Sequence, residues 1–157
     1  MVDMFGFFKK KIDLSDLSNL TMHDIEKLKK SKGGEYSEIL TKAADQGSLD
    51  CQKVLSSFYL ASMVGYYSRP PHTCPTDVEE KFLKYAEMAA YRGDITSQCN
   101  LGKYYYDKID LSENILYDED HEYVKKTEFW YKKAADQGCE DSINIIEKLD
   151  FLFRLVD

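Results

Sequence analysis

The chain has 157 residues, of which 43% are hydrophobic and 31% are charged, and its formal net charge is −7. This balance is that of a globular domain with one continuous core, and it excludes a disordered chain. The surplus of acid argues against nucleic acid or an anionic membrane surface as partner. No apolar run reaches the ~20 residues of a membrane-spanning helix. The start, MVDMFGFFKKK, places its basic residues after a short apolar stretch, the reverse of a secretory signal, so we expect a cytoplasmic protein.

The periodicity of apolar residues predicts helices throughout and no β-strand. The first covers residues 21–31, with Thr21 as its N-cap, and the others follow at about 35–46, 48–66, 77–92, 94–107, 119–137 and 140–155. Thr76 and Glu79 have the spacing of a capping box at the start of the fourth helix. Two longer loops interrupt the series, one proline-rich at 68–75 and one within the acidic stretch 107–122.

A pentapeptide recurs along these helices at a nearly fixed period. AADQG stands at 43–47 and 134–138, and AAYRG stands between them at 89–93. A period of a few tens of residues is typical of a stacked repeat array. Each glycine follows the end of an apolar helical segment, where a left-handed residue terminates a helix. We therefore expect Gly47, Gly93 and Gly138 to form the corners of helix hairpins, each followed by a helix whose buried face begins with a small residue four positions on.

The residues around the second and third corners resemble a known family. Gly93-x₃-Ser97-x₃-Leu101-Gly102-x₂-Tyr105, and then Trp130-Tyr131-x₂-Ala134-Ala135-x₂-Gly138, are similar to the Sel-one-like repeat, a relative of the tetratricopeptide repeats. The first copy departs from the pattern with Leu55-Ser56, and the third has Ile146-Glu147 and no tyrosine. The resemblance implies an all-α fold, an α-solenoid of antiparallel helix pairs with about seven helices. It divides the chain into a leader and capping segment, 1–34, and a repeat domain, 35–157.

The family resemblance implies a non-enzymatic protein-binding module. Its members are mostly bacterial adaptors in signalling, virulence and competition, and some small ones look like immunity proteins. An immunity or adaptor protein that binds one basic toxin is the most concrete expectation, and a scaffold in a signalling or secretion pathway is the alternative. A cysteine-rich branch is linked to penicillin binding and hydrolysis, so a hydrolase is the alternative of another class. Its cysteines pair within each repeat, whereas this chain has single ones at 51, 74, 99 and 139.

The sequence carries no motif for a metal, a cofactor or catalysis. No CxxC pair occurs, and without a secretory signal we expect reduced thiols, with Cys51 and Cys99 as small core residues. His72 and Cys74 stand two residues apart in the proline-rich loop, which we interpret as a plain surface loop. We therefore expect neither metal nor cofactor.

Tyrosines and acids are the candidate partner-binding residues. Tyrosine is enriched at protein interfaces, and residues 107–122 carry seven acids against one lysine, hence −6 of the net charge. The stretch 143–156 has more apolar residues than one helix face can bury, which predicts that a second surface covers this helix. The candidates are the N-terminal MFGFF segment, a second copy of the chain and the partner, so we expect a monomer or a weak homodimer through the C-terminal helix. The expected contact residues are Tyr66, Tyr67, Tyr104, Tyr106, Asp118, Glu119 and Asp120.

Overall fold

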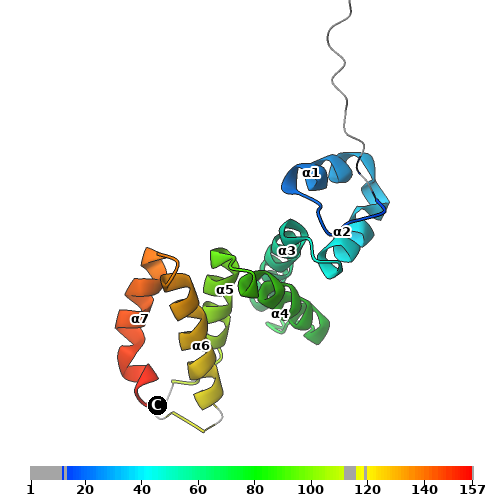
Figure 1. The fold of residues 1–157 in the computed structure, drawn as a ribbon. Helices are drawn as coiled ribbons and strands as arrows, with labels where there is room; N and C mark the ends of the chain where they lie inside the picture. Colours follow the sequence, from blue (N-terminus) through cyan, green and yellow to red (C-terminus); the bar gives the residue numbers. More distant parts are fainter. Residues whose placement is uncertain (1–11, 13, 112–115, 119, 157) are drawn as a thin grey trace, which may run out of the picture. The chain divides into compact units, whose positions relative to one another are not determined.

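The structure is a computed structural model that describes residues 12, 14–111, 116–118 and 120–156. Those residues form seven α-helices and one 3₁₀ helix (η1) and no strand, which confirms the expected all-α helical-repeat fold (Figure 1). None of the helices in the described part of the chain has the length and apolar composition needed to cross a bilayer. The elements are α1 Met22–Ser31, η1 Gly33–Glu35, α2 Tyr36–Asp45, α3 Leu49–Tyr67, α4 Thr76–Tyr91, α5 Ile95–Tyr106, α6 Asp120–Ala135 and α7 Glu140–Phe153.

The chain forms two compact units, of which the first ends at Cys51 and the second begins at Gln52. The division falls inside α3. In the second unit, α4 contacts α5, α5 contacts α6 and α6 contacts α7, so neighbours in sequence are neighbours in space (Figure 1). The first unit holds α1, η1 and α2, which contact one another.

The three corner glycines have the conformation that the sequence predicts. Their φ angles are +105° at Gly47, +93° at Gly93 and +84° at Gly138, which is the left-handed region. Each corner carries the same two hydrogen bonds of a Schellman motif. At the first, Gly47 N donates to Ala44 O at 3.1 Å and Ser48 N donates to Ala43 O at 2.9 Å. The pentapeptide therefore recurs because it ends one helix and turns the chain into the next.

The side chain before each corner glycine reaches back to an earlier helix or loop. Gln46 Oε1 accepts the backbone N–H of Leu17 at 3.2 Å in the first unit. In the second unit Arg92 Nη1 donates to Gln52 Oε1 at 3.4 Å, and Gln137 Nε2 donates to Gln98 Oε1 at 2.8 Å. Gln52 and Gln98 both stand five residues after a corner glycine and are both buried. We call these last two contacts the amide ladder; they fix the register of successive helix pairs.

Two apolar clusters form the core of the second unit. The larger joins Met63 of α3 and Phe82 of α4 to Leu101 and Tyr105 of α5 and Trp130 of α6. The smaller joins residues after α5 with α6 and the end of α7, namely Ile109, Val124, Leu152, Phe153 and Val156. The buried faces begin four residues after each corner, as expected, since Cys51, Ser97 and Ser142 are all buried.

One of the two expected N-terminal caps is wrong. Thr21 caps α1 as expected: its side chain accepts from Asp24 N, and the Asp24 carboxylate accepts from the backbone of Thr21. At α4, however, the N-cap is Pro75 and makes no side-chain cap bond, while Thr76 is already the first helical residue. The capping box fails because the Glu79 carboxylate bonds to residues far along the chain, as described below.

Candidate functional site

A groove in the second unit lies between α3 and α5. Its volume is about 520 Å³. From α3 it is lined by Leu60, Met63, Val64 and Tyr67, and on the side of α5 by Tyr104 with charged residues around it. The α3 residues follow a spacing of three or four, so they form one stripe along the helix. Met63 is buried, but Val64 is 58% exposed and Tyr67 is 45% exposed, so the stripe reaches from the core out to solvent.

Glu79 of α4 holds Tyr104 in place in the groove wall. Its Oε1 accepts from Tyr104 Oη at 2.5 Å and from Lys108 Nζ at 2.6 Å. The Lys108 ammonium also lies 5.1 Å from the centre of the Tyr104 ring, and the Phe82 ring packs on Tyr104 at a centroid distance of 5.5 Å. Both side chains that define this wall are thus fixed by a single carboxylate oxygen.

The electrostatics of this cluster follow from its partial burial. Burial alone would raise the pKa of the Glu79 carboxyl, but the hydrogen bonds from Lys108 and Tyr104 and the lysine charge bring it below its ordinary value. Burial and the bond to Glu79 raise the pKa of the Tyr104 hydroxyl far above its usual range, so the phenol stays neutral and donates. The cluster is therefore a fixed ion pair with a neutral tyrosine.

A second ion pair lies at the outer edge of the groove. Lys103 Nζ contacts Asp107 Oδ2 at 2.8 Å, and both side chains are more than half exposed. The edge therefore presents both signs of charge to solvent, while the floor is apolar. Such a surface can bury apolar side chains of a ligand and exchange weak ion pairs with its polar groups.

The structure separates the four tyrosines that sequence analysis grouped. Tyr67 and Tyr104 meet in the groove. Tyr66 lines a different hollow with Phe58 and the loop residues Arg69 and Pro70. Tyr106 borders a third hollow formed with α6 and α7. Residues one or two positions apart on a helix point in different directions, so only one tyrosine of each pair reaches the groove.

The acidic stretch is less available for contact than its formal charge suggests. Asp118 is exposed, whereas Glu119 lies outside the described residues. Asp120 is only 4% exposed and its Oδ1 accepts the N–H of Asp110 at 3.3 Å, so this residue organises the turn before α6. This burial argues against the partner contact that the sequence predicts for the Asp120 carboxylate. Glu122 pairs with Lys126 at 2.6 Å.

Sequence analysis missed Val64, Glu79 and Lys108 as parts of one site. The α3 stripe had a signal, because Leu60, Val64 and Tyr67 keep a helical spacing that continues past the buried residues. The link from Glu79 to Lys108 had none, since its partners are far apart in sequence. The proline-rich loop stays a surface element: His72 is exposed and its Nδ1 lies 2.9 Å from Tyr67 O. No cluster of three or more His, Cys, Asp or Glu suited to a metal exists among the described residues.

Comparisons of the chain with protein-family models, with curated proteins and with solved structures found no match.

Proposed function

We propose that this chain is a non-enzymatic protein-binding module of the Sel-like repeat type, and that the groove between α3 and α5 takes an apolar segment of one protein partner. The observation that carries the proposal is the exposed stripe of α3, with Val64 and Tyr67 open to solvent above a buried floor. An apolar surface with aromatic residues and a polar edge is the anatomy of a protein interface.

The pairing of the charged groups supports protein binding rather than catalysis. The charged side chains at the groove are paired with one another, Glu79 with Lys108 and Lys103 with Asp107. A general acid or base needs a group free to exchange its proton with a substrate. Groups held in ion pairs instead give orientation and specificity to a partner that packs against them.

The most concrete form of this function is a cytoplasmic bacterial immunity or adaptor protein whose partner is a basic toxin; a scaffold in a signalling or secretion pathway is the alternative. The net charge of −7 favours a basic partner, because opposite charge accelerates encounter. Of the three acids expected at the contact, Asp118 is the one that the structure describes as exposed, and we expect it to take part.

Partner capture with matched variants tests the proposal. Tagged wild-type chain, a Val64→Asp variant and a Phe151→Ser variant are used as bait in extracts of the host cell. Val64 lies in the groove, and Phe151 is equally exposed but lies on α7, so it serves as the control. We expect the same partner with wild type and Phe151→Ser, and its loss with Val64→Asp.

The captured protein is then purified and its affinity measured by calorimetry against all three baits. Melting curves by circular dichroism establish that each variant is folded. A partner that binds Val64→Asp as tightly as wild type would place recognition elsewhere and refute the groove. Turnover of a β-lactam by the purified chain would instead favour the hydrolase.

A further inference from the structure

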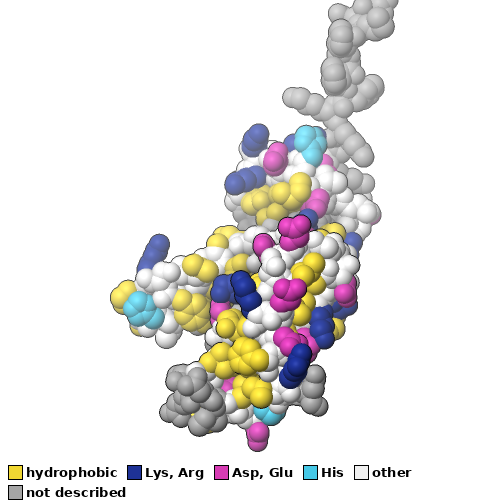
Figure 2. Space-filling view, turned by 90° about the vertical axis from the view of Figure 1, so that its left-hand side faces the viewer, with side chains coloured by type: hydrophobic (Ala, Val, Ile, Leu, Met, Phe, Trp, Pro, Cys, Tyr) yellow, Lys and Arg dark blue, Asp and Glu magenta, His cyan; other side chains and the backbone are white. Residues whose placement is uncertain are grey.

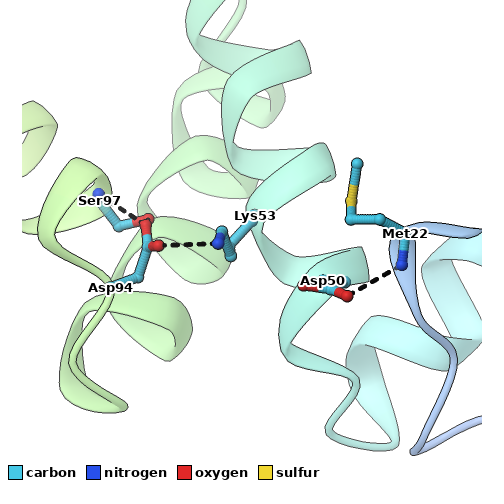
Figure 3. Close-up of polar contacts among 5 residues, drawn as sticks. All are labelled: Met22, Asp50, Lys53, Asp94 and Ser97. Atoms are coloured by element: carbon cyan, nitrogen blue, oxygen red, sulfur yellow. Dashed lines mark hydrogen bonds and ion pairs between the residues drawn. The ribbon is translucent and has the colours of Figure 1, made fainter.

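Two positions in successive repeats lie opposite each other. One is the residue directly after a corner glycine, and the other is the sixth residue after the corner glycine of the preceding repeat. Lys53 stands six residues after Gly47, and Asp94 stands one residue after Gly93. Figure 3 shows their side chains pointing toward each other, with Lys53 Nζ 3.2 Å from Asp94 Oδ1. Asp94 also caps α5, since its Oδ2 accepts from Ser97 N at 2.9 Å. Burial opposes the charge of Asp94, but the bonds from Ser97 and Lys53 lower the pKa of its carboxyl.

The next repeat has cysteines at these two positions. Cys99 stands six residues after Gly93, and Cys139 stands one residue after Gly138. Their sulfur atoms lie 3.7 Å apart, and the Ser142 hydroxyl lies 3.3 Å from Cys99 Sγ and 3.4 Å from Cys139 Sγ. A pair of thiols therefore occupies the place of the ion pair in the preceding repeat.

Cys139 is poorly suited to the capping role of its equivalents. Ser48 and Asp94 each accept an N–H of the helix that follows, whereas Cys139 makes no side-chain cap bond at the start of α7. Thiol sulfur is a weak acceptor, so a hydroxyl or a carboxylate would serve the helix better. The contact between its sulfur and that of Cys99 is therefore the feature that distinguishes Cys139 from its equivalents.

The two thiols differ in environment. Hydrogen bonding from Ser142 lowers the pKa of the Cys139 thiol, although burial and the Asp141 charge oppose this. Burial raises the pKa of the Cys99 thiol, and the neighbouring Asp141 and Cys139 add to the rise. Both residues are partly exposed, which allows a small reagent to approach the thiols.

We propose that Cys99 and Cys139 form a redox modification site that a low-molecular-weight disulfide, of the glutathione disulfide type, oxidises to an intramolecular disulfide. The Cys139 thiolate attacks one sulfur of the reagent, which forms a mixed disulfide and releases one reagent thiolate. Cys99 loses its proton to solvent and attacks Cys139 Sγ, which forms the Cys99–Cys139 bond and releases the second thiolate. The two cysteines lose two electrons and the reagent is reduced to two thiols.

The product would lock α5 to the corner between α6 and α7. The sulfur atoms need only approach by a further ~1.7 Å to reach bonding distance. The bond would close a loop that contains all of α6, so it would restrict the unfolded chain and hold the last repeat against the one before it. The oxidised position would then carry a covalent link where the preceding repeat carries the Lys53–Asp94 pair.

The experiment uses the full chain. Each cysteine falls in a different tryptic peptide, so mass spectrometry can assign a cross-link to its two cysteines. The reduced protein is incubated with glutathione disulfide, alkylated and analysed by mass spectrometry. We expect a loss of two hydrogens in intact mass and a cross-link between peptides 93–103 and 134–148. The melting temperature should rise, and a reducing agent should reverse the rise.

Three variants make the outcome decisive. Cys99→Ser should leave a persistent glutathione adduct on Cys139 and no cross-link. Cys139→Ser should also prevent the cross-link, while Cys74→Ser, which removes the thiol of the proline-rich loop, should behave as wild type. The proposal is overturned if wild type keeps the same Cys139 adduct as Cys99→Ser, if Cys74 enters the main cross-link, or if the cross-linked chain melts no higher than the reduced one.

Discussion

Gly102 of α5 gives a sharp test of how closely the helices pack. An ideal Cβ built at this position would lie 3.0 Å from three atoms of the Tyr131 ring on α6. The contact involves a large, buried ring that cannot move without displacing its own neighbours. Gly102→Ala should therefore overpack the α5–α6 interface, at a cost of about 1–3 kcal/mol.

The same substitution also gains helix propensity, so its net effect on stability is the overpacking cost minus this gain. Alanine is favoured over glycine inside a helix by about 1 kcal/mol, which leaves Gly102→Ala neutral to about 2 kcal/mol less stable than wild type. Gly65 of α3 is the matched control, because a Cβ there would meet nothing within 4 Å. Gly65→Ala should show the propensity gain alone, about 0.5–1 kcal/mol of added stability.

The assay is urea unfolding of both variants followed by circular dichroism at 222 nm. A third variant, Gly102→Ala with Tyr131→Leu, should lose less stability than the sum of its single changes, because the clash is gone. If Gly102→Ala stabilises the chain as much as Gly65→Ala does, the close approach of α5 to Tyr131 is refuted.

Three further predictions concern the core, the Glu79 cluster and the end of the array. Leu101→Ala removes a fully buried side chain and should cost about 2–5 kcal/mol of unfolding free energy; a variant as stable as wild type would contradict the repeat packing. Glu79→Gln should cost roughly 1–2 kcal/mol at pH 7. Because the folded pKa of Glu79 is lowered from 4.5, its contribution is present above that value and is lost as the pH falls through the folded pKa, so the two unfolding curves should converge in acid. Phe151 of α7 and Leu155, two residues after its end, are 64% and 60% exposed. Figure 2 views the molecule from the side on which α7 lies in Figure 1, and hydrophobic side chains gather among charged ones on that face. We expect weak self-association in sedimentation that Phe151→Ser abolishes; a wild-type chain that stays monomeric at high concentration would exclude this surface.

The repeat corners could be predicted because their cause is local. A glycine at the end of an apolar helical segment is enough to set a left-handed residue, and Gly47, Gly93 and Gly138 all adopt it. The helices follow from the same periodicity, and their ends lie within two residues of the expected ones. Local chemistry also gave the cap of α1 at Thr21.

The groove and the thiol pair could not be predicted from local patterns. Glu79 has the spacing of a capping residue, but its carboxylate accepts hydrogen bonds from Tyr104 and Lys108, which lie more than twenty residues away in sequence. Cys99 was expected to be a core residue, although it is only partly buried and contacts Cys139. An alignment of the three repeats on one another could have found that contact, because Lys53 and Asp94 have opposite charges at the same two positions.

The amide ladder ends at the third corner, and this has a consequence for assembly. Five residues after Gly138, where the earlier repeats have Gln52 and Gln98, stands Ile143, which is exposed. An array that offers a matching donor at one end and acceptor at the other can stack head to tail without limit and grow into filaments. A helix pair of another copy that approached α7 in this register would meet a hydrocarbon side chain in place of an amide, and the side chain before its corner glycine would find no acceptor there. The amide ladder therefore has no acceptor at position 143 through which a further helix pair could continue it.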